Sequence, residues 1–403
     1  MPWTEQNVVS LRAEFVRLAE AGGVGVAELC RRYGISRKTG HKWIARHREL
    51  GNDGLRDRSR RPKTMRCPTP PQVEARVVAL RREHPAWGGR KLHHVLKREG
   101  CDPLPAASTI TAILHRHGLI APEASAAAGP CQRFQREQPN ELWQMDFKGE
   151  FRLIDESWCH PLTVLDDCTR FNLVLAACRS QKRETVRTQL ERAFGRYGLP
   201  DAMLMDNGSP WATGHAAGRH TRLSAWLLRL GVRVLHGRPR HPQTQGKEER
   251  FHRTLKSEVL TWKRFADHAA AQSAFDAWRP VYNAERPHDA LGMKTPSELY
   301  VASRRSLPLS LPPIEYGPGD LVRKVNPVGQ LRLEGRTFKI SEAFGGEPVA
   351  LRATPVDGEY EVYYCSTRVA KISLREPAGG ADEATSSSPP QADEAEDIRA
   401  VRM

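Results

Sequence analysis

The chain has 403 residues, of which 39% are hydrophobic, and its formal net charge of +15 corresponds to an isoelectric point of about 9.7. This length is enough for two to four domains with a sizeable core. The strong positive charge predicts a polyanionic partner, with nucleic acid the first candidate. The longest apolar run, Leu173–Cys178, is far too short to span a bilayer, and the N-terminus has no apolar signal core. These features exclude a membrane protein and favour a cytoplasmic one.

Three Pro-rich or small-residue stretches, at 56–72, 121–141 and 303–320, each suit a linker between domains. Residues 1–100 hold 22 Lys or Arg against 10 Asp or Glu, whereas 376–403 hold 7 acidic against 2 basic residues. The front of the chain is therefore expected to make the main electrostatic contact with nucleic acid. The predicted parts are a helix-turn-helix domain (1–58), a second helix-turn-helix-like domain (70–121), an α/β core (135–302), a small β-domain (314–375) and an acidic, Ser- and Pro-rich disordered tail (376–403).

Residues 27–51, "AELCRRYGISRKTGHKWIARHRELG", predict the first helix-turn-helix. Gly34 permits the tight turn, and Ser36 is a good N-cap for the second helix. That helix would direct Trp43 and Ile44 toward a core. Its outward face is basic, as expected of a helix that lies in a DNA major groove; a solvated basic face without DNA is the alternative. The candidate DNA-binding residues on this face are Arg37, Lys38, Lys42 and Arg46.

Residues 73–120 predict a second helical unit, with a break between His84 and Gly89 and a short helix capped near Ser108. A helical spacer is the alternative to a second helix-turn-helix. Neither the histidines of this unit nor the cysteines of the chain have a spacing that specifies zinc or a redox site. We expect the eight cysteines to be free thiols, mostly buried, in a reducing compartment. The histidines in question are His93, His94, His115 and His117.

From Glu141 onward the pattern changes to strands alternating with amphipathic helices. Two runs, 141–153 and 159–179, read as successive strands of a meander. A helix is predicted over 183–198, a short strand ends at Asp206, and a further helix and strand precede the segment at 241–260. This order predicts an α/β domain with a mixed sheet.

Two aspartates stand where such a sheet presents functional groups. Asp146 lies within the first strand, on the opposite face from its neighbours. Asp206 ends a later strand, and Gly208 lets the backbone turn sharply after it. A third carboxylate from a helix laid across the sheet would complete an oxygen-rich site of the kind that Mg²⁺ prefers. Two such ions about 4 Å apart can hold both the attacking and the leaving oxygen of a phosphodiester.

The segment 241–260, "HPQTQGKEERFHRTLKSEVL", carries two adjacent glutamates as candidates for that third carboxylate. On a helical wheel Glu249 shares one face with Arg253 and Lys256, whereas Glu248 sits at the margin of the packing face. A metal ligand should stand at a polar edge with cations beside it, so we favour Glu249. Arg253 and Lys256 would position phosphates, with Arg250 a lesser candidate. Asp166 and Asp167 are weaker alternatives as ligands, since turns between strands commonly carry Asp for local hydrogen bonds.

The motifs "WQMDFKG", "LDDCTRF", "DNGSPW", "HPQTQGKEERFHRTLK" and "YNAERPHDALGMKTPSELY" together resemble the integrase-core transposases of bacterial insertion sequences, relatives of retroviral integrase. The resemblance implies an RNase H-like fold with a DDE triad, matched here by Asp146, Asp206 and Glu249. It also implies that Lys256, seven residues after the glutamate, contacts DNA. Residues 314–375 are similar to the small C-terminal β-barrels of these transposases, which bind DNA.

Two features depart from the family pattern. Positions 207–248 place 42 residues between Asp206 and Glu249, longer than the usual gap by roughly two helical turns. The excess is expected in the loop "WATGHAAGRH". The chain also lacks the His/His/Cys/Cys zinc module of retroviral integrases, and helix-turn-helix units occupy the front instead.

The sequence thus predicts a transposase that binds the terminal inverted repeats of an insertion sequence and performs Mg²⁺-dependent strand cleavage and strand transfer. Two Mg²⁺ ions are the expected cofactors, and Mn²⁺ could take their place. Two element ends must be brought together on double-stranded DNA, so we expect a homo-oligomer. The alternatives are a catalytically inactive helix-turn-helix regulator derived from a transposase and a plain nuclease without strand transfer.

Overall fold

The fold is taken from a computed structural model, which describes residues 8–58, 69–120, 135–206, 208, 211, 220–236 and 246–375. The tail predicted to be disordered and the loop expected to hold the extra residues before α8 lie outside the described residues. The chain divides into two compact units, Met1–Pro68 and Thr69–Met403. In the part of the chain that is described, no helix is both long and apolar enough to cross a membrane.

The first unit is a helix-turn-helix domain, as predicted. Gly34 adopts the left-handed φ of +63° that the turn requires, and the Ser36 side chain accepts a hydrogen bond from the Thr39 N–H at 3.1 Å. Trp43 and Ile44 are buried in its small core. Its elements are α1 (Val8–Glu20), α2 (Val26–Arg32), α3 (Arg37–Leu50) and a 3₁₀ turn (Gly51–Leu55).

A three-helix bundle opens the second unit, and the predicted break between its first two helices is confirmed. The last helix begins at Ala107, with Ala106 at the N-cap and no side-chain cap, so the predicted cap near Ser108 is wrong. A side chain at Gly89 would collide with Thr111, which explains a glycine where α5 and α6 pack closely. The helices are α4 (Pro71–Glu83), α5 (Gly89–Arg98) and α6 (Ala107–Arg116).

The core of the second unit is a six-stranded mixed sheet, as the strand and helix order predicts. Strands follow the order β2-β3-β1-β5-β6, and β4 also pairs with β3. The first strands pair antiparallel as a meander, whereas β5 pairs parallel to both β1 and β6. The strands are β1 (Trp143–Phe147), β2 (Phe151–Arg152), β3 (Trp158–Asp166), β4 (Asn172–Cys178), β5 (Ala202–Met205) and β6 (Arg233–His236).

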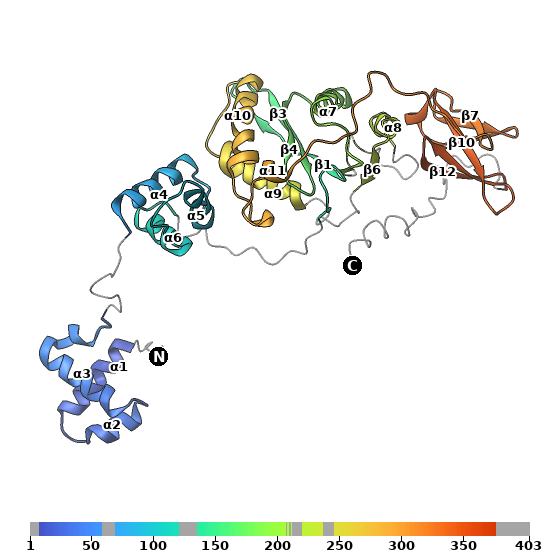
Figure 1. The fold of residues 1–403 in the computed structure, drawn as a ribbon. Helices are drawn as coiled ribbons and strands as arrows, with labels where there is room; N and C mark the ends of the chain where they lie inside the picture. The colour runs from blue at the N-terminus through green and yellow to red at the C-terminus, as the bar shows by residue number, and fades with distance from the viewer. Residues whose placement is uncertain are drawn as a thin grey trace. The chain divides into compact units, whose positions relative to one another are not determined.

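Helices cover both faces of this sheet, each over its own apolar core (Figure 1). On one face, α7 and α8 pack against inward residues such as Met145 and Val164. On the other, α9 and α10 pack against residues such as Leu165 and Leu175. The two cores follow from the two-residue period of the strands, which sends alternate side chains to opposite faces. The helices are α7 (Arg183–Tyr197), α8 (Arg222–Arg229), α9 (Gly246–Leu255), α10 (His268–Pro280) and α11 (Pro296–Leu299).

The C-terminal strands form an antiparallel sheet in the order β12-β11-β10-β7 and a separate hairpin of β8 and β9. The described pairings include none that closes these strands into the predicted barrel. Ala225 and Leu228 of α8 belong to the same apolar core as this sheet. The strands are β7 (Leu321–Lys324), β8 (Gln330–Leu333), β9 (Arg336–Lys339), β10 (Pro348–Ala353), β11 (Glu359–Tyr364) and β12 (Thr367–Ser373).

The six described cysteines are all free thiols, which agrees with the expected absence of disulfides among them. Only three of the six are buried, so the expectation of mostly buried thiols is too strong. Burial raises the pKa of the Cys159 thiol to about 12 and that of Cys178 to about 11, which leaves both as unreactive core residues.

Candidate active site

Asp146 lies near the end of the central strand β1, on the face that α9 covers. Its side chain is 23% exposed. One carboxylate oxygen accepts a hydrogen bond from the Phe147 N–H at 2.8 Å, and the other lies 3.9 Å from Nδ1 of His252. Burial, followed by the negative charges of Asp206 and Glu249, raises the pKa of Asp146 to about 7. The three predicted acids are therefore near enough for their charges to interact.

The sheet register explains why Asp206 is close to Asp146. Trp143 pairs with Met203 and Gln144 with Leu204 in the parallel ladder between β1 and β5. Continuing this register by two residues sets Asp206 opposite Asp146, at the spacing of about 5 Å between neighbouring strands.

The turn after β5 leaves room for the Asp206 carboxylate. Its Oδ1 accepts a hydrogen bond from the Gly208 N–H at 3.0 Å. A Cβ atom at Gly208 would approach Oδ2 of Asp206 to 3.1 Å, so a side chain there would crowd the carboxylate. The absence of a side chain at Gly208 thus leaves space beside the Asp206 carboxylate.

The two adjacent glutamates of α9 point in different directions. Glu249 is exposed, whereas the Glu248 side chain is fully buried. The helical wheel separates the two correctly, but Glu248 lies inside the core, not at its margin. Burial, followed by the charge of Asp146, raises the pKa of Glu248 well above its ordinary value.

Thr163 of β3 ties Glu248 to the strand that carries Asp146. Its Oγ1 lies 3.0 Å from the Asp146 carbonyl oxygen, 2.9 Å from Oε2 of Glu248 and 2.8 Å from Nε2 of His252. A hydroxyl has one proton to donate, and a carbonyl can only accept. Donation to the carbonyl therefore requires the other two bonds to come from a protonated Glu248 and from the His252 Nε2–H. Burial supports both states, because it also lowers the pKa of His252 to about 3.

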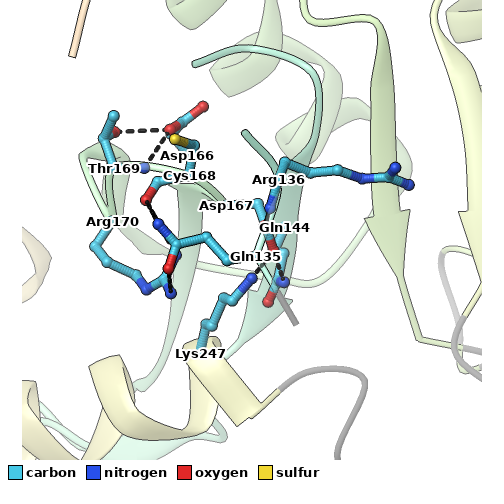
Figure 2. A network of polar contacts seen from close by, with 9 residues as sticks. All are labelled: Gln135, Arg136, Gln144, Asp166, Asp167, Cys168, Thr169, Arg170 and Lys247. Atoms are coloured by element: carbon cyan, nitrogen blue, oxygen red, sulfur yellow. Dashed lines mark hydrogen bonds and ion pairs between the residues drawn. The ribbon is translucent and has the colours of Figure 1, made fainter. Parts of the chain in front are cut away.

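Asp166 and Asp167, the weaker candidates for metal ligands, are instead bound by protein donors (Figure 2). Asp166 accepts hydrogen bonds from the Asn140 N–H at 2.7 Å and from both the N–H and the hydroxyl of Thr169 at 2.8 and 2.7 Å. Asp166 and Asp167 are both buried, at 0% and 3% exposure. These contacts are those of an aspartate that stabilises a turn between strands.

Asp167 makes the longer-range contacts of this network. It accepts hydrogen bonds from the Gln144 side chain at 2.6 Å and from the Arg136 N–H at 2.8 Å, and it forms an ion pair with the Lys247 ammonium group (Figure 2). Burial lowers the pKa of Lys247 to about 8. Sequence analysis missed this pair, because its members are 80 residues apart.

The cations predicted on the glutamate helix are exposed: two lie on α9, and the third begins the π-helical turn Lys256–Leu260 that follows it. None of the three has an ion-pair partner among the described residues, as expected of side chains that await a polyanion. They are Arg250, Arg253 and Lys256.

Lys148 joins these cations and was missed by sequence analysis. Burial and the nearby charge of Lys256 lower its pKa. It lies two residues after Asp146, so the two-residue period of a strand, extended past Phe147, could have found it.

On α3, three of the four candidate DNA-binding residues are exposed: Arg37, Lys38 and Lys42. Arg46 is half-buried, donates a hydrogen bond to the Arg56 carbonyl at 3.0 Å and lies over the Trp43 ring at 4.8 Å. Its guanidinium is thus held by its own domain, unlike the outward position that the sequence predicted.

No group of three His, Cys, Asp or Glu side chains within the described ranges is arranged to hold a metal ion as it stands. Asp146 and Asp206 lie at the same end of the neighbouring parallel strands β1 and β5, and Glu249 of α9 is near enough for its charge to affect Asp146, but the three do not form one coordination sphere. Their chemistry nevertheless fits a divalent cation, because the negative charges of Asp206 and Glu249 add to burial in raising the pKa of Asp146, and a cation would offset those charges.

Known domain families match most of the described chain. The integrase core domain matches residues 136–242 and, in a second form, 230–296. A helix-turn-helix domain matches 11–63 and a homeodomain-like domain 39–114. The C-terminal domain of IS481 family transposases matches 320–378. An integrase core preceded by helical DNA-binding modules defines the class of protein.

Curated relatives agree with this class. The uncharacterized 31.7 kDa protein of insertion element IS407 from Burkholderia multivorans is 30% identical over 238 residues, which are 58% of this chain and 82% of that protein. The 39.2 kDa protein of IS476 from Xanthomonas euvesicatoria is 27% identical, over 68% of this chain and 78% of its own. Transposase InsD of IS2-9 from Escherichia coli is 28% identical, over 73% of this chain and 94% of its own.

The chain belongs to the integrase-core transposases of insertion elements, which are enzymes of the DDE polynucleotidyl transferase class. Among solved structures, a simian T-cell lymphotropic virus intasome complex aligns with a TM-score of 0.38 and 15% identity, covering 74% of this chain and 96% of the matched chain.

Proposed function

We propose that Asp146, Asp206 and Glu249 are the catalytic carboxylates of a transposase that cuts the ends of its element and joins them to target DNA. The observation that carries the proposal is the parallel ladder between β1 and β5, whose register, continued by two residues, would set the two aspartates opposite each other on neighbouring strands. The negative charge of Glu249 on α9 also helps to raise the pKa of Asp146, which supports a place for the third acid near the first.

These three acids would hold two Mg²⁺ ions, with Mn²⁺ as a substitute. When bound, the ions would supply charge stabilisation for the attacking and leaving oxygens of a phosphodiester. The fit rests on the donor set, since carboxylate oxygens are the ligands that these hard cations prefer. Asp166 and Asp167 are not proposed as ligands, because protein donors occupy their oxygens.

The cations beside the acids would orient the DNA strand. Arg253 near the end of α9 and Lys256, which begins the π-helical turn after it (Lys256–Leu260), are both exposed, and Lys148 adds a third positive charge near the end of β1. Arg250 is a lesser contributor. The strand would first be hydrolysed to leave a 3′-hydroxyl, which then attacks a target phosphodiester in line. Holding both reactants in one place converts this second step into an effectively unimolecular one.

Recognition of the element would depend on the helix-turn-helix domain. Arg37, Lys38 and Lys42 of α3 are exposed and would contact phosphates and base edges of the terminal inverted repeats, although the Lys42 ammonium lies 4.2 Å over the Trp43 ring. Arg46 would instead stabilise the helix that carries them. The C-terminal strands would close into a small DNA-contacting barrel. Two element ends must react together, so we propose a homo-oligomer on DNA.

The proposal is tested by incubating the protein with Mg²⁺, labelled element-end DNA and a target plasmid. Joined products support strand transfer. Nicked ends without joining would make the protein a nuclease, and binding without cleavage would make it a regulator. Glu249→Gln and Glu248→Gln are compared in parallel: cleavage should be lost only in the first variant. Loss of cleavage only in the second would move the third carboxylate to Glu248 and overturn this assignment.

A further inference from the structure

Within the described ranges Glu249 makes no hydrogen bond through its own side chain, so its position depends on the residues beside it. The two residues that precede it are both anchored in the protein interior. Lys247 pairs with the Asp167 carboxylate, and Glu248 bonds to Thr163. Glu249 therefore projects from the end of a doubly tethered segment.

Both tethers end on β1, the strand that carries Asp146. Asp167 accepts a hydrogen bond from Gln144, two residues before Asp146 on the same strand face. Thr163 bonds to the carbonyl oxygen of Asp146 itself. The start of α9 and the strand with the first acid are thus linked through side chains, independently of the chain segment that connects them.

The link through Asp167 is suited to fix a distance. The Lys247 and Asp167 side chains are only 16% and 3% exposed, so solvent screens their attraction little. Asp167 also holds the Arg136 N–H, which leaves its carboxylate no freedom to follow a shift of the helix (Figure 2). A carboxylate with three fixed donors acts as a rigid hub between β1, the turn after β3 and α9.

We propose that the buried ion pair between Lys247 and Asp167 is a positioning device that sets Glu249 against Asp146 for catalysis. The inference rests on the proposed function, because it gives the pair a role in the same reaction. Neither member contacts DNA or the reacting atoms; both act through the place they give to Glu249. A misplacement of about 1 Å at a reacting group can lower a rate about 10²-fold, so a modest relaxation of α9 would be visible in turnover.

The test compares Lys247→Met, Asp167→Asn and the double variant in full-length protein. Each single variant leaves one buried partner unpaired and should lower both the melting temperature and the turnover rate. The double variant is neutral at both positions and close in shape to the original pair. It should regain most of the melting temperature while its turnover stays at least about 10-fold below wild type, with KM for element-end DNA little changed, because orienting groups act mainly on the reacting geometry.

Hydrogen–deuterium exchange of the segment 246–255 supplies a measurement that needs no activity. The double variant should exchange faster there than wild type, and at the wild-type rate in α7. Removing the exposed ion pair between Arg187 and Glu191 on α7, 2.8 Å long, is the matched control and should change neither turnover nor exchange in 246–255.

Recovery of turnover together with melting temperature in the double variant would show that the pair only stabilises the fold, and would overturn the proposal. Unchanged exchange in 246–255 would overturn it as well. If wild-type protein neither cuts nor joins DNA, the proposed function fails, whereas the exchange result still decides whether the pair holds α9.

Discussion

Two groups of carboxylates lie at opposite ends of the neighbouring strands β1 and β3 and differ in what surrounds them: Asp166 pairs with Trp143 at the start of β1, whereas Asp146 pairs with Thr163 near its end. Asp166 and Asp167 are buried, and N–H, O–H and ammonium donors bind their oxygens. Asp146, Asp206 and Glu249 make few such contacts, and one of them has its pKa raised to about 7. The first group is held by several donors, whereas Asp146 and Asp206 each accept one backbone N–H bond and Glu249 accepts none among the described residues.

This difference separates acids that hold the fold from acids that are available for chemistry. A buried carboxylate with three donors has no coordination site to offer. Carboxylates with few donors keep oxygens that a cation can bind, and groups with a perturbed pKa, such as Asp146, gather at functional sites. The same contrast recurs within two adjacent residues, since Glu248 is buried and bonded while Glu249 is exposed.

The largest expected effect comes from removing one of the three proposed catalytic acids. Glu249→Gln should lower DNA cleavage by on the order of 10³-fold or more, because members of a catalytic set act as a unit. The melting temperature should stay at or above the wild-type value, since the change removes a repulsive charge. Gel-based cleavage and differential scanning calorimetry on one preparation check both. A variant that cuts DNA normally would remove Glu249 from the site.

For Asp166, whose carboxylate accepts hydrogen bonds from protein donors, we expect a loss of stability and not a specific loss of activity. Asp166→Ala removes the acceptor for three hydrogen bonds and leaves buried N–H groups without partners, which should cost about 3 kcal/mol or more of unfolding free energy. Urea unfolding measures the loss. Asp201→Ala, which breaks an exposed ion pair with Arg305, is the control and should cost about 1 kcal/mol or less. A large fall in turnover per folded molecule would contradict the distinction between the two groups.

A pH dependence tests the environment of Asp146 without any DNA. The folded protein disfavours ionised Asp146, since its pKa is about 7 instead of the usual 3.8. Its contribution to stability is therefore complete below about pH 4 and is lost as the pH rises through 7.

Asp146→Asn cannot ionise and should escape this loss. In metal-free buffer it should be more stable than wild type by about 2–4 kcal/mol at pH 8 and nearly equal to it at pH 4. Denaturant unfolding at the two pH values measures the difference. Millimolar Mg²⁺ at pH 8 should stabilise the wild type and reduce the gap. A gap that does not change with pH would show that the folded protein does not raise the pKa of Asp146.

Much of this arrangement could be predicted from local sequence. Strand alternation placed Asp146, the end of a strand placed Asp206, and a helical wheel chose the outward glutamate correctly. Each of these depends on the period of one element or on its end. The same reasoning placed Gly34 and Ser36 in the first turn of the helix-turn-helix domain.

The contacts that connect elements could not be predicted in this way. The pairing of Lys247 with Asp167 depends on which strand α9 packs against and on its position along that strand. The local sequence pattern specifies neither. The complete burial of Glu248 depends on Thr163 and His252, one of which lies on another element. The outward position predicted for Arg46 is wrong for a similar reason. Its side chain donates a hydrogen bond to the Arg56 carbonyl, which lies beyond the end of α3 and outside the helical pattern.

The smallest expected effect belongs to Glu248, and it tests the contrast at its closest point. A protonated glutamate and a glutamine are both neutral and nearly equal in size, so Glu248→Gln should change the unfolding free energy by less than about 1 kcal/mol. Glutamine can donate to Thr163 Oγ1 as the protonated acid does, so cleavage should fall less than about 10-fold, the low end for groups that support catalytic ligands. Glu248→Ala leaves a cavity and should cost about 2–3 kcal/mol. If the glutamine variant were as inactive as Glu249→Gln, Glu248 would have to be ionised, and it would belong with the candidate catalytic acids Asp146, Asp206 and Glu249.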